Sequence, residues 1–307
     1  MATGDVSIRT DDLRRTFDGL TALDGVTLDV DGPKIVGVAG PNGSGKTTLI
    51  RALLGLLEPT AGSARVNGTS PLSFGEADRA RLGYMPQTDA VYGDLIVREN
   101  VSFFARLYDV DDRERAVDRA LSFVDLDQRA DDRIAALSGG MVRRASLACA
   151  VVHDPDVLFL DEPTVGLDPQ LRAGMWRGFR ERRDDGALIL VSTHYLGEAR
   201  NCDQVLFLRD GRVVALDAPG TFLRETGTET LEEAFLSLLD GEGSSTLSAT
   251  GEGTQGIENV ETGTESTEEE FETLKERSET PEERTENAER ETENPEKGNW
   301  SAEERSR

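Results

Sequence analysis

The sequence predicts an α/β fold with a central parallel β-sheet. Two short runs, residues 35–39 and 157–160, are almost wholly apolar, as expected of strands that are buried on both faces. A glycine-rich loop follows the first run, and two adjacent acidic residues follow the second. The chain has 307 residues, which at roughly 100–200 residues per domain allows one or two domains.

The glycine-rich loop has the pattern of a phosphate-binding loop. Residues 40–47 read G-P-N-G-S-G-K-T, with a strand-like run before them and a helix-like run, residues 48–57, after them. Glycines let successive N–H groups face inward, and the start of the helix adds positive potential there. We expect Lys46 to neutralise the β- and γ-phosphates and Thr47 to ligate Mg²⁺. The predicted binding residues are Gly40, Pro41, Asn42, Gly43, Ser44, Gly45, Lys46, Thr47 and Thr48.

The acidic residues Asp161 and Glu162 predict the second half of this site. An acid at the tip of a strand beside a phosphate loop holds Mg²⁺ through water, and we assign that role to Asp161. Glu162 is then placed to orient or deprotonate the attacking water. The two side chains can divide this work because they leave an extended strand on opposite faces.

A third polar motif lies between these two halves. Residues 137–141 read L-S-G-G-M and precede a helix-like run that extends to Val152. Ser138 suits an N-cap, and Gly139 and Gly140 leave N–H groups bare, so this helix start is a second anion site. Two such helix starts beside a single lysine-bearing loop suggest that nucleotide is shared between chains.

Together these motifs resemble the ATP-binding subunit of an ABC transporter over residues 5–240. In that family's pattern Phe17 corresponds to an adenine-stacking aromatic residue, although an ordinary core aromatic remains an alternative. Gln87 corresponds to the Q-loop glutamine, Asp168 to the D-loop aspartate and His194 to the switch histidine. The resemblance implies a P-loop NTPase core of the ABC ATPase type, with an antiparallel β subdomain and an inserted α-helical subdomain.

The resemblance also implies a mechanism. Two subunits, as a homodimer or with a paired ATPase subunit, would sandwich two ATP molecules head to tail. Each ATP would lie on one chain's phosphate loop and be closed by the other chain's Ser138, Gly139 and Gly140. Glu162, His194 and Gln87 would be catalytic, and Thr47, Gln87 and Asp161 would serve Mg²⁺. A separate transmembrane permease would dock near residues 87–108, which include an amphipathic helix-like run, so the chain is expected at the cytoplasmic face of the membrane.

The choice between classes of ABC protein depends on weaker signals. Residues 137–144, 193–200 and 231–238 resemble ABC-2 type exporters, including daunorubicin-resistance-like subunits. Met141 stands where many relatives have Gln, but anion binding by this loop is mainly a backbone property. The alternatives are a soluble ABC ATPase that is not coupled to transport and a scaffold that binds ATP without hydrolysing it. A single cassette without heptads disfavours the first, and intact Glu162 and His194 disfavour the second.

The charge is acidic and unevenly distributed. The net charge is −25, which argues against nucleic acid as a partner because phosphate binding needs clustered Lys and Arg. Residues 241–307 contribute −13 through 20 Glu against 7 basic residues, and their composition predicts a disordered tail. Residues 1–240 contribute −12 and contain only two lysines, a bias that favours a halophilic source, although a solvated acidic surface is the plainer interpretation.

The remaining sequence signals are few. Cys149 and Cys202 lie far apart, which argues against a disulfide framework or a zinc site. No signal peptide and no spanning segment are recognisable, so we expect an intracellular chain. His153 is the only histidine besides His194, and we expect it to cap the C-terminus of a helix.

Overall fold

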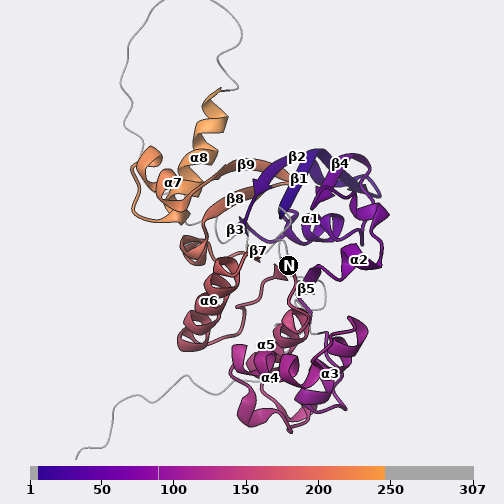
Figure 1. The fold of residues 1–307 in the computed structure, drawn as a ribbon. Coiled ribbons are helices and arrows are strands. Elements are labelled where there is room, and N and C mark those ends of the chain that lie inside the picture. The colour runs from indigo at the N-terminus through magenta and orange to yellow at the C-terminus, as the bar shows by residue number, and fades with distance from the viewer. Residues whose placement is uncertain (1–5, 89, 246–307) are drawn as a thin grey trace, which may run out of the picture. The chain divides into compact units, whose positions relative to one another are not determined.

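The computed structural model describes residues 6–88 and 90–245, and it has the predicted α/β fold (Figure 1). Within these residues, a six-stranded sheet has the order β5-β6-β7-β3-β8-β9 and is parallel except for β9, which is antiparallel to β8. Its strands are β3 (Lys34–Ala39), β5 (Leu82–Met85), β6 (Val157–Asp161), β7 (Leu188–Thr193), β8 (Gln204–Arg209) and β9 (Arg212–Asp217).

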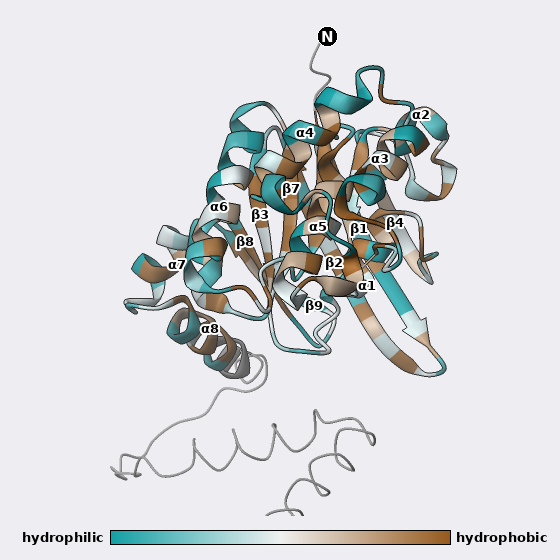
Figure 2. Ribbon diagram, turned by 90° about the horizontal axis from the view of Figure 1, so that it is seen from below, coloured by the Kyte–Doolittle hydropathy of each residue, from teal (hydrophilic) through white to brown (hydrophobic). Residues whose placement is uncertain are grey.

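The inner strands are continuously apolar because both faces of the sheet are buried. Alternate residues of a strand point to opposite faces. Ile35 of β3 and Leu160 of β6 belong to the hydrophobic core on the face that the helices cover. Val36 of β3 and Phe159 of β6 belong to the second core, on the other face. Figure 2 shows mainly brown, hydrophobic segments along the strands of this sheet and many teal, hydrophilic segments on the outer helices.

An antiparallel sheet covers the second core. Its order is β2-β1-β4, formed by β1 (Ser7–Phe17), β2 (Leu20–Asp31) and β4 (Ala61–Val66). Helix α1 (Lys46–Leu53) contributes Leu49 and Ile50 to the same core. This helix begins and ends earlier than the predicted 48–57. It stops because Gly55 adopts a left-handed φ of 70°, where an added Cβ would lie 2.3 Å from a carbonyl oxygen.

A helical insertion separates β5 from β6. It contains α3 (Val97–Leu107), α4 (Arg113–Phe123) and α5 (Gly139–Val151), which pack against one another through small and aliphatic side chains such as Ala105, Leu121 and Leu147. Figure 1 shows the three helices grouped together, apart from the antiparallel sheet. The expected antiparallel β subdomain and inserted α-helical subdomain are therefore both present.

The remaining elements flank the sheet. They are α2 (Glu76–Arg79), α6 (Pro169–Asp184), α7 (Pro219–Thr226), α8 (Leu231–Ser245) and the 3₁₀ segments Pro71–Ser73, Asp127–Arg129, Ile134–Ala136 and Leu196–Asn201. Helix α8 continues past the predicted boundary at Asp240, and the rest of the predicted tail, residues 246–307, lies outside the described residues. None of the described helices has the length and hydropathy needed to span a membrane.

His153 does not cap a helix as expected. Its ring stacks on Tyr108 with the ring centroids 3.7 Å apart, and its Nε2 lies 3.0 Å from the carbonyl oxygen of Leu82. Burial lowers its pKa to about 4, so the ring is neutral at physiological pH. It therefore packs between the helical insertion and strand β5.

Candidate functional site

The phosphate-binding loop curls tightly between β3 and α1. Gly45 has a φ of 106°, and an added Cβ would lie 2.6 Å from the carbonyl oxygen of Ala22. At Gly40 an added Cβ would lie 2.0 Å from the carbonyl oxygen of Leu208. Only glycine fits both positions, so the loop can follow a path that aims its N–H groups inward. Lys46 begins α1, and its Nζ donates hydrogen bonds to the carbonyl oxygens of Gly40 and Pro41 at 2.8 and 2.9 Å.

The acidic pair lies at the carboxyl end of β6, as predicted. Asp161 is fully buried, and its Oδ1 accepts a hydrogen bond from the Ser192 hydroxyl. The same hydroxyl accepts a hydrogen bond from the Glu162 N–H at 2.9 Å. Glu162 has a φ of 50°, a left-handed conformation that is uncommon for a residue with a side chain. Ser192 thus holds the backbone at the point where the chain turns out of the sheet.

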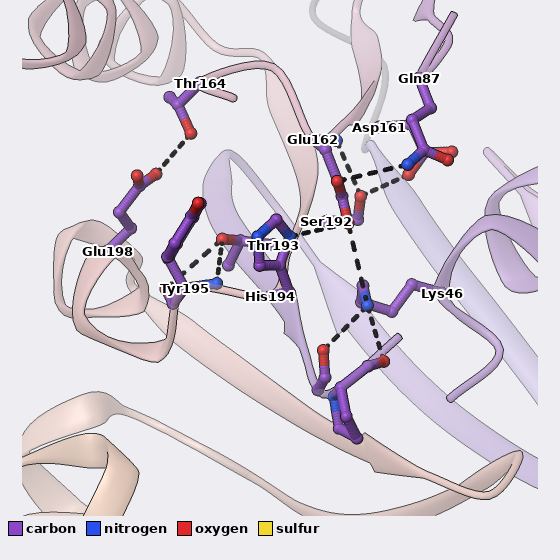
Figure 3. Close-up of polar contacts among 12 residues, drawn as sticks. Lys46, Gln87, Asp161, Glu162, Thr164, Ser192, Thr193, His194, Tyr195 and Glu198 are labelled. Carbon is purple, nitrogen blue, oxygen red and sulfur yellow. Dashed lines mark hydrogen bonds and ion pairs between the residues drawn. The ribbon is translucent and has the colours of Figure 1, made fainter. Parts of the chain in front are cut away.

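Three predicted residues converge on the Glu162 carboxylate (Figure 3). Lys46 Nζ lies 4.0 Å from Oε1, and His194 Nδ1 lies 3.1 Å from the same oxygen. Gln87, in the loop after β5, donates from Nε2 to Oε2 at 3.4 Å. These residues come from four separate segments of the chain. They meet because the carboxyl ends of parallel strands lie along one edge of the sheet.

Burial and charge act in opposite directions on Lys46. Its side chain is only 6% exposed, and desolvation lowers the pKa of its ammonium group. The negative charges of Glu162 and Asp161 raise this pKa and offset part of the cost of burial. The pair of acids therefore helps to keep a cation inside the phosphate loop.

The third motif lies at the start of α5, as expected. Ser138 occupies the N-cap position, but its side chain makes no capping hydrogen bond, which departs from the prediction. Gly139 and Gly140 are the first residues of the helix. Ser138 and Gly140 line a cleft of about 830 Å³ together with Gln87, Glu162 and Asp168. Asp168 caps α6 by accepting hydrogen bonds from the N–H groups of Gln170 and Leu171.

Phe17 lies apart from these groups, at the end of β1. Its side chain is 38% exposed, so it is not an ordinary core aromatic residue. The guanidinium carbon of Arg15 lies 4.3 Å from the centroid of its ring. An exposed ring that is steadied by a cation can present a π-face to a planar ligand.

The site fits a nucleotide with a divalent cation. Asp161 Oδ2 is buried and has no hydrogen-bond partner among the described residues, while Oδ1 is occupied by Ser192. The hydroxyl of Ser44 in the phosphate loop is also buried without a partner. Thr47 lies half-buried in the first turn of α1. The described ranges contain no group of three or more His, Cys, Asp or Glu that could hold a metal ion by themselves.

Two residues of the site were not predicted from the sequence. Ser192 holds both acids, and its signal is a polar side chain at a fully buried position of β7. Arg143 lies on α5 with its guanidinium against the loops that carry Gln87 and Glu162. The sequence signal for Arg143 is a charged residue at the start of a run of residues in α5 that are all buried.

Comparisons with known proteins agree with this geometry. Residues 23–165 match the family model described as ABC transporter. The Nod factor export ATP-binding protein I of Paraburkholderia xenovorans is 40% identical over 232 residues, which cover 74% of this chain and 76% of that protein. A solved ATP binding subunit of an ABC transporter shares 31% identity with a TM-score of 0.70, and the match covers 76% of this chain and 99% of that one.

A dimeric ATP-binding cassette that was solved with ADP and Pi has the same fold. Its TM-score is 0.64 at 23% identity, and the match covers 69% of this chain and 98% of that chain. The chain therefore belongs to the ABC transporter family, as one of its ATP-binding ATPases.

Proposed function

We propose that this chain is the motor subunit of an export system and that it drives a separate permease by hydrolysing ATP. None of the described helices could span a membrane, so the proposal places the membrane path in that permease. The observation that carries the proposal is the convergence of Lys46, Gln87 and His194 on the Glu162 carboxylate. The export function is supported by the relatives named Nod factor export ATP-binding protein I. The ABC-2 type strings in the sequence favour the same branch.

The residues divide the chemistry among themselves. Loop N–H groups and Lys46 hold the phosphates of ATP, and Phe17 stacks on the base. Glu162 orients or deprotonates the attacking water, while His194 contacts the γ-phosphate and helps to fix that water. Thr47, Gln87 and Asp161 serve Mg²⁺, which neutralises charge on the phosphates when it is bound. Nucleotide binding by this acidic chain should therefore require Mg²⁺, and tight ATP binding in excess chelator would contradict that requirement.

We propose further that two chains associate head to tail and share two ATP molecules. The cleft that contains Ser138 and Gly140 is open, and the N–H groups at the start of α5 suit the phosphates of a nucleotide held by another chain. A closed two-fold arrangement would pair each loop with the other chain's helix start.

The permease should dock near residues 87–108, which would hold the chain at the cytoplasmic face of the membrane. Tyr92, Phe103 and Leu107 are large apolar side chains there that are 53%, 40% and 64% exposed. Tyr92 and Phe103 pack edge to face with their centroids 5.3 Å apart, so they present one exposed aromatic surface. Gln87 begins the same segment and contacts Glu162, which gives a route from the docking surface to the site.

Substitution of Glu162 by Gln tests the catalytic assignment. The amide cannot accept a proton from water, so steady-state ATP turnover should fall by about 100-fold or more while ATP binding persists and an ATP-bound dimer accumulates. Glu181→Gln, an exposed glutamate on α6, is the matched control and should keep wild-type turnover. Equal turnover by Glu162→Gln and the wild type would refute the assignment.

A second comparison separates transport from a soluble ATPase function. Phe103→Ser should lower the amount of chain recovered with washed membranes of its own cells, because it removes an exposed apolar anchor. Leu72→Ser, at an exposed residue outside residues 87–108, should not. Basal ATP turnover should be unchanged in both. Recovery of the wild type in the soluble fraction alone would favour the soluble ATPase.

A further inference from the structure

Arg143 lies where three parts of the site meet. It is in the second turn of α5, and it is only 6% exposed. Its Nη1 donates to the carbonyl oxygens of Pro86 and Gln87 at 2.8 and 2.7 Å. Its Nη2 donates to the carbonyl oxygens of Asp161 and Glu162. One side chain therefore binds the backbone of both loops that carry predicted catalytic groups.

The shape of the guanidinium group makes this arrangement possible. It is planar and holds its N–H donors in a fixed fork, so the two pairs of carbonyl oxygens must keep a set separation. A buried cation is tolerated when polar groups surround it, and here backbone carbonyl dipoles supply that environment. A lysine ammonium is a point charge without the fork, and it cannot bridge two loops in the same way.

The backbone of Glu162 depends on such support. Its φ of 50° is sparsely populated by residues with a side chain, and it persists only where neighbouring groups hold it. Ser192 holds its N–H at 2.9 Å, and Arg143 holds its carbonyl oxygen at 2.9 Å. The side chain of the same residue lies 3.1 Å from His194 and 3.4 Å from Gln87. A small rotation of this backbone would move the carboxylate away from both.

We infer that Arg143 is a positioning residue for ATP hydrolysis: from helix α5 it holds the Gln87 loop and the Glu162 backbone together. The inference rests on the proposed roles of Gln87 and Glu162. Arg143 lines the cleft at the start of α5, and in this scheme it acts through its contacts with the backbone of Gln87 and Glu162. It sets the place of these two residues, and it ties them to the helix whose first residues close on the nucleotide of the partner chain.

Arg144 provides a matched control. It follows directly on the same helix and is also 6% exposed. Its Nη1 donates to the carbonyl oxygens of Val124 and Asp125, after α4 in the helical insertion, and lies 3.7 Å from the exposed Asp125 carboxylate, a pair that a lysine could also make. Replacing either arginine by lysine therefore removes the same kind of buried bridge between a side chain and backbone carbonyls. Both side chains line the cleft at the start of α5, but only Arg143→Lys removes contacts with the backbone of Gln87 and Glu162.

The test measures kcat, the KM for MgATP, ATP binding and thermal unfolding of the full chain with Arg143→Lys or Arg144→Lys. A misplacement of about 1 Å in the reacting groups costs on the order of 100-fold in rate, so Arg143→Lys should lower kcat by about that factor while KM and ATP binding change less than about threefold. Arg144→Lys should lower the unfolding temperature by a similar amount and leave kcat within about threefold. Loss of kcat in proportion to the fall in unfolding temperature in both variants, or an unchanged kcat in Arg143→Lys, would overturn the inference.

The double variant Arg143→Lys with Glu162→Gln separates this inference from the proposed function. If Arg143 acts through Glu162, the double variant should turn over ATP at the rate of Glu162→Gln alone. A further loss of about 100-fold in the double variant would show that Arg143 acts elsewhere. If Glu162→Gln alone retained wild-type turnover, the proposed catalytic role would fail first, and this inference would fall with it.

Discussion

The carboxyl edge of the parallel sheet and the start of α5 are the two proposed anion sites, and they hold their polar groups differently. At the sheet edge, Lys46 and His194 lie within 4.0 Å of the Glu162 carboxylate, and every one of these groups has contacts inside the chain. At the start of α5, the Ser138 side chain makes no capping hydrogen bond, and a Cβ added to Gly139 would meet no atom within 4 Å from the other described residues beyond its own helical turn. The groups proposed for the chemistry are thus held by contacts within one chain, whereas the proposed closing surface at the start of α5 has fewer such contacts.

The largest expected effect comes from breaking either half of a shared site. Lys46→Met removes the cation that faces the phosphates, and Gly139→Asp places a carboxylate where the open helix start would meet them. Each variant should lose on the order of 1,000-fold in ATP turnover, as removal of preorganised electrostatic contacts does. The open space around Gly139 and the preference of helix starts for acidic residues should keep the second variant folded.

Co-expression of these two variants turns the comparison into a test. In a mixed dimer both lesions fall on one composite site, and the other site keeps an intact loop and an intact helix start. Random pairing makes about half of the dimers mixed, and each has one of two sites intact, so roughly a quarter of wild-type turnover should return. Mixtures that stay as inactive as each variant alone would contradict a site shared head to tail.

A smaller effect should follow from changing Phe17, which lies outside both sites. Stacking of a base on an aromatic ring contributes about 1–3 kcal/mol, so Phe17→Ala should weaken ATP binding by about tenfold or more. Phe17→Tyr keeps the ring and should bind as the wild type does. Because Phe17 touches no phosphate, kcat at saturating ATP should hardly change. A loss of kcat without a change in binding would show that the ring supports the fold and not the base.

The sequence predicted the parts of the site that are coded by local patterns. Lys46 was predictable because the loop around it spans only residues 40–47, and Asp161 because it ends an apolar run. Arg143 and Ser192 were not, because their partners lie far away in sequence: Arg143 reaches back 57 residues to Pro86, and Ser192 reaches back 31 residues to Asp161. Only the strand order of the sheet brings such pairs together.

The fold, like the site, could be predicted from local sequence patterns only in part. Continuous apolar strands predicted a sheet that is buried on both faces, whereas the antiparallel sheet and the helical insertion were expected from the family resemblance and not from periodicity. Adaptation to high salt is a prediction from composition alone. It would be contradicted by full stability of residues 1–245 within the whole chain at low ionic strength.

The smallest effect on turnover is expected at His153, which packs between the helical insertion and strand β5. Its Nε2 lies 3.0 Å from the Leu82 carbonyl oxygen on the sheet side, and its ring stacks on Tyr108 of the insertion. Burial lowers the pKa of its imidazole from 6.5 to about 4. Between these two values the unfolded chain binds a proton that the folded chain does not, so the folded state loses stability as the pH falls through this window and keeps it above pH 6.5.

This penalty can reach on the order of 3 kcal/mol at the acid end of the window. His153→Gln does not titrate and keeps a donor for the Leu82 carbonyl oxygen, so its free energy of unfolding should fall less between about pH 6.5 and 4. Urea unfolding of both proteins across this range measures the difference, and ATP turnover near pH 7 should stay within about twofold. If the free energy of unfolding fell equally with pH in the wild type and in His153→Gln, protonation of His153 would not contribute to the pH dependence of stability. A large loss of turnover would mean that the helical insertion is coupled to the candidate site through His153 as well as through Arg143.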